Sequence, residues 1–306
     1  MIPFSLTILG TSSALPTSKR YPTAQVLNIR ERFFLIDCGE GTQIQLRKYS
    51  VKFSKINHIL ISHLHGDHYF GLIGLLSTFA LVGRSSDLHI YSHSELPDIL
   101  KVQLEYLSSE IRFKIIWHPL NFKRKQTVFE DDAVKVTSIP LKHRVPCCGF
   151  IFSEKEQPKN IKKDKIQEFN IPLRDLPAIK FGADYITEDG AIISNSELTQ
   201  PNKKTRSYAF CTDTIYLPKL AETLKGVDLL YHEATYDKSL LKRAGETFHS
   251  TAGQAAMIAK NSNAGRLILG HFSARYKDCT ILLDEAKEIF PETIIAEEGL
   301  VIDVEN

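Results

Sequence analysis

The stretch Ser62–Gly71, SHLHGDHYFG, places three histidines and one aspartate within six positions. It follows the apolar run INHILIS, residues 56–62, whose composition is typical of a buried strand. A strand that ends here would place His63, His65, Asp67 and His68 on a loop at the edge of a sheet, where α/β proteins usually bind ligands. Imidazole nitrogens and carboxylate oxygens are zinc ligands, and one loop with two such pairs can serve two neighbouring metal ions.

Further metal ligands are predicted at the ends of other apolar runs. His143 follows VTSIPLK, Asp213 follows YAFCT and His271 follows RLILG. A site with two metal ions needs such additional ligands, and strand ends would supply them at the same edge. The remaining histidines outside the motifs described below lack this placement or lie within strands, and we interpret them as structural or exposed: His58, His89, His93, His118 and His232.

The composition indicates an ordinary globular protein with a weak overall charge. Of its 306 residues, 43% are hydrophobic and 24% are charged, and the net charge is +2. A polyanion would therefore have to bind to local basic patches. The five cysteines have no CxxC spacing, and we interpret them as buried thiols in a reducing compartment. The chain has no apolar stretch near the roughly 20 residues of a membrane helix and no signal-peptide pattern, so we expect a cytoplasmic protein without membrane contact.

Short β-branched and aromatic runs alternate with helical patterns in both halves of the chain. This alternation predicts an α/β sandwich made of two sheet-plus-helix halves, residues 1–152 and 205–306. The strands expected before residue 150 are 5–10, 24–29, 32–39, 56–63, 88–92, 111–119 and 133–143, and the helices are 41–49, 70–83 and 96–107.

The segment 153–204 between the two halves has a different composition. It begins with the polar run EKEQPKNIKKDK, residues 154–165, and we expect it to be an inserted arm outside the main core. Its basic side chains, with that of Arg206 just beyond it, either contact nucleic-acid phosphates or form a solvated charged surface. They are Lys155, Lys159, Lys162, Lys163, Lys165, Lys203, Lys204 and Arg206.

Taken in order, HxHxDH, a lone histidine, a lone aspartate and a late lone histidine resemble the pattern of the metallo-β-lactamase superfamily. More narrowly, the chain resembles ribonuclease Z, the tRNA 3′-processing endoribonuclease. This resemblance covers nearly the full length and keeps the order of the motifs. They are LGTSSALPT from Leu9, DCGEGTQ from Asp37, SHLHGDHYFGLIGLL from Ser62, HEAT from His232, HST from His249 and HFSARY from His271.

The resemblance implies a fold, a reaction and a metal site. The fold would be an αββα sandwich of the metallo-β-lactamase type, one domain over residues 1–306, with the arm binding tRNA. The protein would be a homodimeric, zinc-dependent endoribonuclease that removes 3′ extensions from precursor tRNA and leaves a 3′-hydroxyl. Two Zn²⁺ per chain are implied, one on His63, His65 and His143, the other on Asp67, His68 and His271, with Asp213 bridging them.

The resemblance also implies roles for individual side chains. Asp67 would accept the proton of the attacking water, His249 would protonate the leaving oxygen, and Glu233 would orient the His249 ring. Two other interpretations stay open: Glu233 as a buried structural carboxylate, and His249 as a loop residue before Ser250 at a helix N-cap. Arg275 and Tyr276 could hold a phosphate or a base, although a surface salt bridge would explain Arg275 equally well.

Two other functions are compatible with parts of this sequence. The first is another two-metal hydrolase of the superfamily, acting on a small ester or cyclic phosphodiester, which would have no use for a long basic arm. The second is a metal-stabilised nucleic-acid-binding module without turnover. Asp67 and His249 argue against the second, because a site that performs no reaction has no need of either.

Overall fold

The computed structural model describes residues 2–107, 109–201 and 204–305, and its strands of three or more residues form two mixed sheets. The chain divides into two compact units, one made of the residues up to Ser153 together with those from Arg206 onward, the other of residues 154–205. Lys203, one of the basic residues predicted in the arm, lies outside the described residues.

The first sheet of the large unit is antiparallel at one side and parallel at the other. β1 and β2 pair antiparallel with their neighbours, whereas the sheet is parallel from β3 to β6. Its seven described strands, in spatial order, are β18 (Val301–Asp303), β1 (Phe4–Gly10), β2 (Ala24–Ile29), β3 (Arg32–Ile36), β4 (Ile56–Leu60), β5 (Leu88–Ser92) and β6 (Ile115–Pro119).

The second sheet has a similar mixed design. β14 to β17 are parallel, and β14 pairs antiparallel with β9. Its seven described strands, in spatial order, are β17 (Thr293–Ile295), β16 (Arg266–Gly270), β15 (Leu229–Glu233), β14 (Ser207–Cys211), β9 (Cys147–Glu154), β8 (Val134–Leu141) and β7 (Gln126–Glu130).

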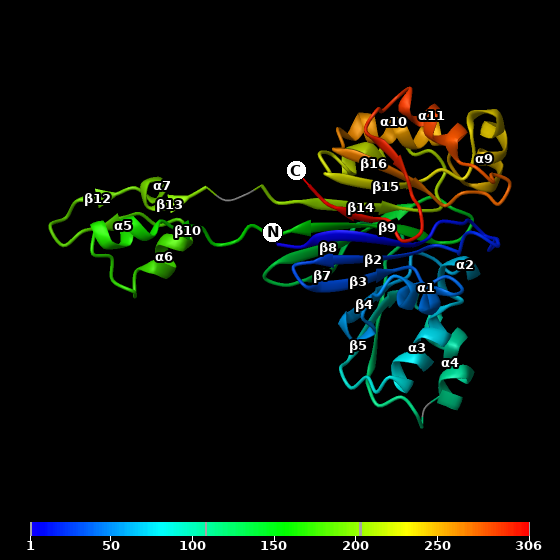
Figure 1. Ribbon diagram of the computed structural model, residues 1–306, viewed down its shortest axis with the longest axis horizontal. Helices are drawn as coiled ribbons and strands as arrows, with labels where there is room; N and C mark the ends of the chain where they lie inside the picture. The colour runs from blue at the N-terminus through cyan, green and yellow to red at the C-terminus, as the bar shows by residue number, and fades with distance from the viewer. Residues whose placement is uncertain (1, 108, 202–203, 306) are drawn as a thin grey trace. The chain divides into compact units, whose positions relative to one another are not determined.

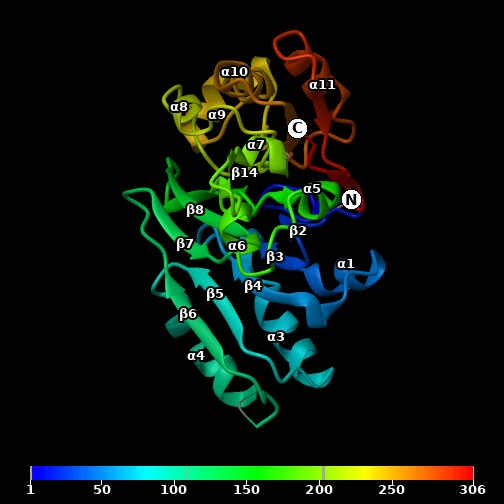
Figure 2. The ribbon, with the colours of Figure 1, turned by 90° about the vertical axis from the view of Figure 1, so that its left-hand side faces the viewer.

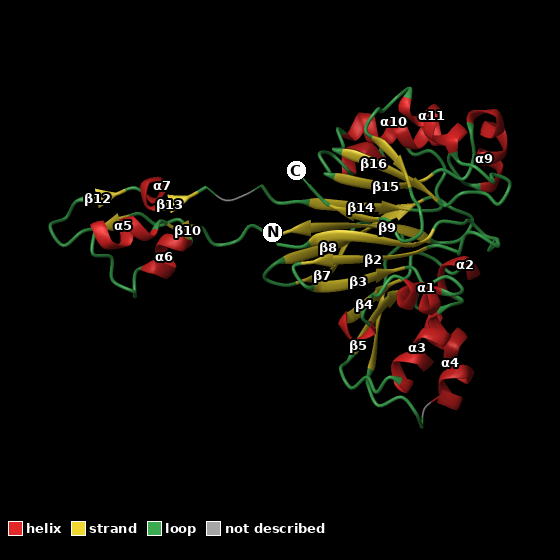
Figure 3. Ribbon diagram, viewed as in Figure 1, coloured by secondary structure: helices red, strands yellow, loops and turns green. Residues whose placement is uncertain are grey.

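Helices cover the outer faces of both sheets. Figure 1 shows α1, α3 and α4 below the first sheet and α10 and α11 above the second, and Figure 2 shows the same order of layers from the side. The helices of this unit are α1 (Thr42–Lys48), α2 (Gly66–Tyr69), α3 (Leu72–Leu81), α4 (Leu96–Leu107), α8 (Leu220–Thr223), α9 (Leu241–Thr247), α10 (Ala252–Ser262) and α11 (Thr280–Lys287), with 3₁₀ turns η1 (Phe53–Lys55) and η2 (Lys238–Leu240). The order helix, sheet, sheet, helix confirms the predicted αββα sandwich (Figure 3).

Apolar residues on both faces of the strands explain this layering. On β3, Phe34 and Ile36 belong to the core cluster that contains residues of both sheets, whereas Leu35 packs in the cluster that includes Leu75 and Phe79 of α3. Because successive side chains of a strand point to opposite faces, a strand buried on both sides needs a continuous apolar run. The run RFFLI therefore places β3 in the interior.

Two glycines allow the loops after β3 and before α3 to approach closely. A Cβ atom at Gly71 would lie 2.0 Å from the carbonyl oxygen of Gly39, and one at Gly39 would lie 2.5 Å from that of Asp67. No side chain fits at either distance. The DCGEGTQ segment and the histidine-rich segment are thereby held against each other.

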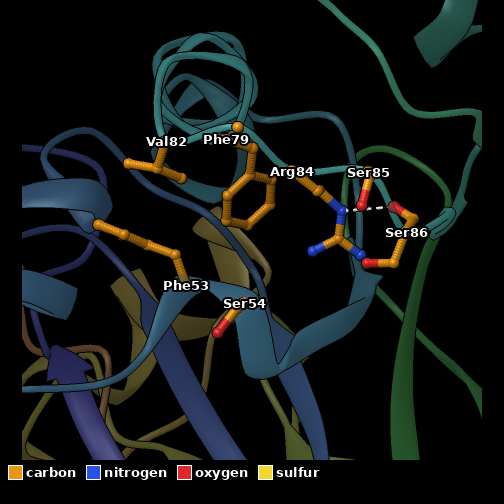
Figure 4. Close-up of a pocket in the computed structure, with 8 residues that line it drawn as sticks. Phe53, Ser54, Phe79, Val82, Arg84, Ser85 and Ser86 are labelled. Carbon is orange, nitrogen blue, oxygen red and sulfur yellow. Dashed lines mark hydrogen bonds between the residues drawn. The ribbon is translucent and has the colours of Figure 1, made fainter.

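A small cavity of about 180 Å³ lies at the end of α3 (Figure 4). Arg84 is a charged residue that lines this cavity. Its Nη1 donates to the carbonyl of Ile56 and its Nε to that of Ser86, each at 2.8 Å. The guanidinium also packs on the Phe79 ring at 5.1 Å. With its donors used by backbone carbonyls, Arg84 ties α3 to the first sheet.

The arm unit, residues 154–205, has a small apolar core of its own. Ile171, Ile179, Tyr185 and Leu198 are buried together. Short elements surround them: β10 (Asn160–Ile161), α5 (Lys163–Glu168), α6 (Leu176–Lys180), β11 (Tyr185–Ile186), β12 (Ile192–Ile193), α7 (Asn195–Leu198) and β13 (Thr199–Gln200). The arm is therefore a folded unit.

The remaining sequence expectations concern membranes and cysteines. Among the described residues, every helix is too short or too polar to cross a membrane. All five cysteines are free, and Cys279 is half-buried while the other four are buried. The prediction of unpaired, largely buried thiols is confirmed.

Candidate metal centre

The centre starts at the carboxyl end of β4. His63 and His65 lie between this strand and α2, whereas Asp67 and His68 lie within α2 itself. The prediction that all four occupy a loop is wrong for Asp67 and His68, because the backbone N–H of His68 bonds the His65 carbonyl at 3.0 Å and closes a helical turn.

The first ligand group contains His63, His65, His143 and Asp213. His65 Nδ1 lies 3.1 Å from His63 Nε2 and 3.1 Å from His143 Nε2. Asp213 Oδ2 lies 3.6 Å from each of the same two Nε2 atoms. Since His143 follows β8 and Asp213 follows β14, segments from three strand ends supply this group.

The second group contains Asp67, His68 and His271. Asp67 Oδ2 lies 3.3 Å from His68 Nε2 and 3.5 Å from His271 Nε2. Asp213 Oδ1 lies 3.3 and 3.1 Å from the same two nitrogens. One oxygen of Asp213 thus faces each group, and all seven residues predicted as ligands are brought together.

These two groups fit metal ions. Ligand atoms about 2.0–2.2 Å from a tetrahedral zinc lie about 3.3–3.6 Å from one another, and the separations measured here are 3.1–3.6 Å. Among the described residues, the buried Nε2 atoms of His68 and His271 have no hydrogen-bond partner. Leaving buried polar atoms unpaired is unfavourable, whereas a metal ion satisfies them. The cluster is therefore a metal-binding site.

Hydrogen bonds to the opposite ring nitrogens orient four of the histidines. His68 Nδ1 lies 2.7 Å from Asp37 Oδ2, and His63 Nδ1 lies 3.1 Å from Ser62 Oγ. His143 Nδ1 lies 2.9 Å from the Phe248 carbonyl, and His271 Nδ1 lies 3.0 Å from Thr235 Oγ1. A neutral imidazole that donates from Nδ1 keeps the Nε2 lone pair for a metal. The partners, which the sequence analysis did not predict, are Asp37 Oδ2, Ser62 Oγ, the Phe248 carbonyl and Thr235 Oγ1.

Glu233 and His249 form a pair beside the ligands. His249 Nδ1 lies 2.9 Å from Glu233 Oε1, which also accepts the Thr214 backbone N–H at 2.7 Å. Thr235 Oγ1 donates to Glu233 Oε2 at 2.6 Å. Glu233 is fully buried, and the His249 side chain keeps 14% of its surface exposed. Glu233 thus bonds directly to His249 and also to Thr214 and Thr235.

The charges of this pair shift both pKa values. Burial alone would lower the pKa of His249, but the charge of Glu233 and its hydrogen bond raise it to about 9. Burial alone would raise the pKa of Glu233, and the charge and hydrogen bond of His249 lower it instead. Glu233 therefore favours the protonated form of His249. It also lies near Asp213 and His271, close enough to reach a metal ion.

Other predicted positions differ from expectation. The N-cap of α10 is Thr251, which forms a capping box with Gln254, and not Ser250, whose hydroxyl instead donates to the Thr214 carbonyl at 2.7 Å. Tyr276 is buried and its hydroxyl donates to Asp237 Oδ2 at 2.6 Å, so that hydroxyl is engaged within the fold. Arg275 is exposed and lies over the Tyr236 ring at 5.1 Å.

The five histidines interpreted as structural or exposed belong to none of these ligand groups. His232 is buried on β15, and His93 stacks on Phe122 with ring centroids 5.3 Å apart. His58, His89 and His118 lie on β4, β5 and β6, where their rings stack in sequence.

Known proteins match this chain over its whole length. Ribonuclease Z of Bacteroides fragilis is 51% identical over 299 residues, 98% of each chain. The crystal structure of the short form of human tRNase Z is 29% identical with a TM-score of 0.72, covering 99% of this chain and all of the other. The metallo-β-lactamase fold protein YhfI of Bacillus subtilis is 20% identical with a TM-score of 0.69, covering 98% of this chain and 99% of the other. The family model described as Anti-Pycsar protein Apyc1 matches residues 4–164.

Proposed function

Because this chain belongs to the ribonuclease Z family of the metallo-β-lactamase superfamily, we propose that its two ligand groups hold two zinc ions. Through residues 4–164 the chain also belongs to the family of the Anti-Pycsar protein Apyc1. The protein is a metal-dependent endoribonuclease of tRNA 3′ processing. The observation that most directly supports two ions is the placement of Asp213, whose two oxygens face different groups. Seven ligands exceed the four that a single tetrahedral zinc uses.

The proposed assignment places His63, His65 and His143 on one zinc and Asp67, His68 and His271 on the other, with Asp213 shared. When bound, the two ions supply Lewis acidity that polarises the scissile phosphodiester and activates water at neutral pH. The side chains of Asp67 and His249 accept and donate the protons that this hydrolysis moves.

Asp67 is the proposed acceptor of the proton from the attacking water. Its Oδ2 accepts the backbone N–H of Ala14 at 2.8 Å, which fixes the carboxylate within the second group. Burial alone would raise the pKa of Asp67, but the charge of His68 together with hydrogen bonds from His271 and His68 lowers it below the usual range of an aspartate. Asp67 is thus ionised, which is the form of a carboxyl group that can accept a proton.

His249 is the proposed general acid. As the bond between phosphorus and the 3′ oxygen of the tRNA breaks, the His249 Nε2–H donates its proton to that oxygen and leaves a 3′-hydroxyl. The hydrogen bond from Nδ1 to Glu233 holds the ring and favours its protonated form. Glu233 therefore acts on the reaction through His249, as a positioning residue.

The arm is the proposed contact for the body of the tRNA. Several of its lysines are already engaged within the unit: Lys159 donates to Asn195, Lys162 to the Glu197 carbonyl and Lys165 to Glu168, each at 2.8 Å. Lys163 and Lys180 are exposed on α5 and α6, where they can neutralise phosphates. We propose that exposed lysines of this kind make the contact with the tRNA.

We also propose a cytoplasmic homodimer. The fractional exposure of Leu81 at the end of α3 is 76%, and that of Val102 and Tyr106 on α4 is 63% and 85%. Exposed apolar side chains on adjoining helices are suited to a protein contact. The small-substrate hydrolase and the non-catalytic binding module are not favoured, because the ribonuclease Z relative matches the full chain, arm included.

The proposal is tested with purified protein and a precursor tRNA that carries a defined 3′ extension. We expect a single cleavage that leaves a 3′-hydroxyl, loss of cleavage after treatment with a chelator, and recovery with zinc. Elemental analysis of the active protein should give two zinc ions per chain. Full activity with one tightly bound ion would contradict the assignment of two metals.

A further inference from the structure

A buried carboxylate beneath the metal centre contacts ligands of both groups. Asp37 directly follows β3 and is completely buried. Its Oδ1 accepts the backbone N–H of Ser62 at 2.7 Å, and its Oδ2 accepts the Ser62 hydroxyl at 2.9 Å. The same Oδ2 lies 2.7 Å from His68 Nδ1. Asp37 therefore bonds directly to a ligand of the second group.

Ser62 extends this contact to the first group. Its Oγ lies 3.1 Å from His63 Nδ1. Since the hydroxyl proton is donated to Asp37, the oxygen keeps lone pairs that accept from the His63 Nδ1–H. The Sγ of Cys147 lies 3.7 Å from the same nitrogen, a longer contact with a weaker acceptor. The path from Asp37 through Ser62 is thus the stronger hydrogen bond to His63.

We propose that Asp37 and Ser62 form one hydrogen-bonded unit that sets the tautomers of His63 and His68 and thereby couples the two metal sites. This inference rests on the proposed two-metal function. A carboxylate only accepts hydrogen bonds, so both the Ser62 hydroxyl and the His68 Nδ1–H must point toward it. Each ring then carries its proton on Nδ1 and keeps its Nε2 lone pair for a metal ion.

The backbone at Asp37 does not by itself require a carboxylate. Its φ of 57° lies in the left-handed region, which asparagine also adopts readily. Asparagine at this position would instead direct an N–H group at Ser62 Oγ or at His68 Nδ1. The proton arrangement of both histidines would change, while the shape of the side chain would remain the same.

The test compares zinc binding by four variants of the full-length, metal-free protein. Competition with a chromophoric chelator gives the two stepwise dissociation constants. Asp37→Asn should weaken both steps by about 10- to 100-fold, and Ser62→Ala should weaken one step to that extent while changing the other less than about threefold. Ser62→Thr keeps the hydroxyl and should bind zinc like the parent. Ser138→Ala is the matched control, because Ser138 is a buried serine on β8 that bonds the Gln126 carbonyl and no histidine.

A second readout separates positioning from loss of structure. Circular dichroism verifies folding, and the visible absorption of the Co²⁺-loaded protein reports the ligands of each site. Asp37→Asn should alter the cobalt bands of both sites, and Ser62→Ala those of one. If Asp37→Asn does not fold, the comparison of Ser62→Ala with Ser62→Thr decides by the same measurements.

The inference is overturned if Asp37→Asn weakens only one of the two zinc-binding steps, or if Ser62→Thr binds zinc as poorly as Ser62→Ala. A parent protein that binds only one zinc ion would instead contradict the proposed two-metal function. The two failures are thus distinguished by the parent protein alone.

Discussion

Acid should destabilise this protein through one partly buried histidine, and replacing that residue should remove the effect. His58 on β4 lies between the rings of Phe34 and His89, at centroid distances of 5.1 and 5.2 Å. Its Nδ1 is 3.4 Å from the hydroxyl of Tyr91. Burial, followed by repulsion from the charges of His89 and His118, lowers the pKa of His58 to about 4.

The magnitude follows from this pKa shift. The usual pKa of a histidine is 6.5, and that of His58 in the folded protein is about 4. Each pKa unit is worth about 1.4 kcal/mol, so the full effect is about 3 kcal/mol. Below pH 6.5 the unfolded chain binds a proton that the folded protein excludes. The stability is therefore complete above pH 6.5 and is lost as the pH falls toward 4, with about 2 kcal/mol lost by pH 5.

The assay is urea unfolding of the metal-free protein, followed by the fluorescence of the single tryptophan, Trp117 on β6. Metal-free protein is used because protonation of the ligand histidines in acid would release bound metal ions, and this release would also change the stability. Between pH 7.5 and pH 5 the free energy of unfolding of the parent should fall by about 2 kcal/mol more than that of His58→Phe. Phe129→Leu is the control, because the Phe129 ring packs on His58 at 4.6 Å and binds no proton. Equal losses in parent and His58→Phe would refute the reasoning.

Two further predictions concern catalysis and the arm. His249→Ala should keep its metal content but lose about 10²- to 10⁴-fold in kcat for precursor tRNA, because its role is proton transfer; loss of a metal ion or unchanged kcat would contradict that role. Replacing residues 154–205 with a short turn should raise KM for precursor tRNA and flatten its salt dependence while hydrolysis of bis(p-nitrophenyl) phosphate stays close to normal. This deletion is feasible because Ser153 pairs with Ser207 in adjacent antiparallel strands, so that a short turn can join them. Unchanged tRNA processing at every salt concentration would mean that the arm is not the tRNA contact.

The fold was predictable where the apolar pattern of a segment matched its burial. The predicted segments 24–29, 88–92 and 96–107 coincide with β2, β5 and α4. β17 and β18 were not predicted as strands, since each has three residues and too little sequence to show a period. β9 was not predicted either, because Gly149 interrupts its pattern. That glycine is required by tertiary structure, as a Cβ there would lie 2.4 Å from the Phe210 carbonyl oxygen.

The site was predictable to the extent that strand ends carry its ligands. Each isolated ligand stands one or two residues after an apolar run, and parallel strands bring such ends to one edge of a sheet. The hydrogen-bond partners of the Nδ1 atoms of these histidines are not placed by strand ends in this way. The Phe248 carbonyl, for example, reaches His143 across 105 positions of sequence, and any residue type supplies a carbonyl. Contacts of this kind depend on tertiary packing alone.

The backbone at the strand ends explains why aspartate and histidine occupy these positions. Asp37, Asp213 and His271 have positive φ angles of 57°, 25° and 58°, and they follow β3, β14 and β16. Side chains within a strand alternate between the two faces of a sheet, so a side chain that reaches over the edge needs a departure from extended backbone. Left-handed conformations cost about 1–3 kcal/mol for most residues, and aspartate and histidine are among the few types enriched there. Glycine would relieve the strain but carries no donor. The residue types that tolerate this turn and can also bind or orient a metal ligand are therefore few, and the metal centre is made from them.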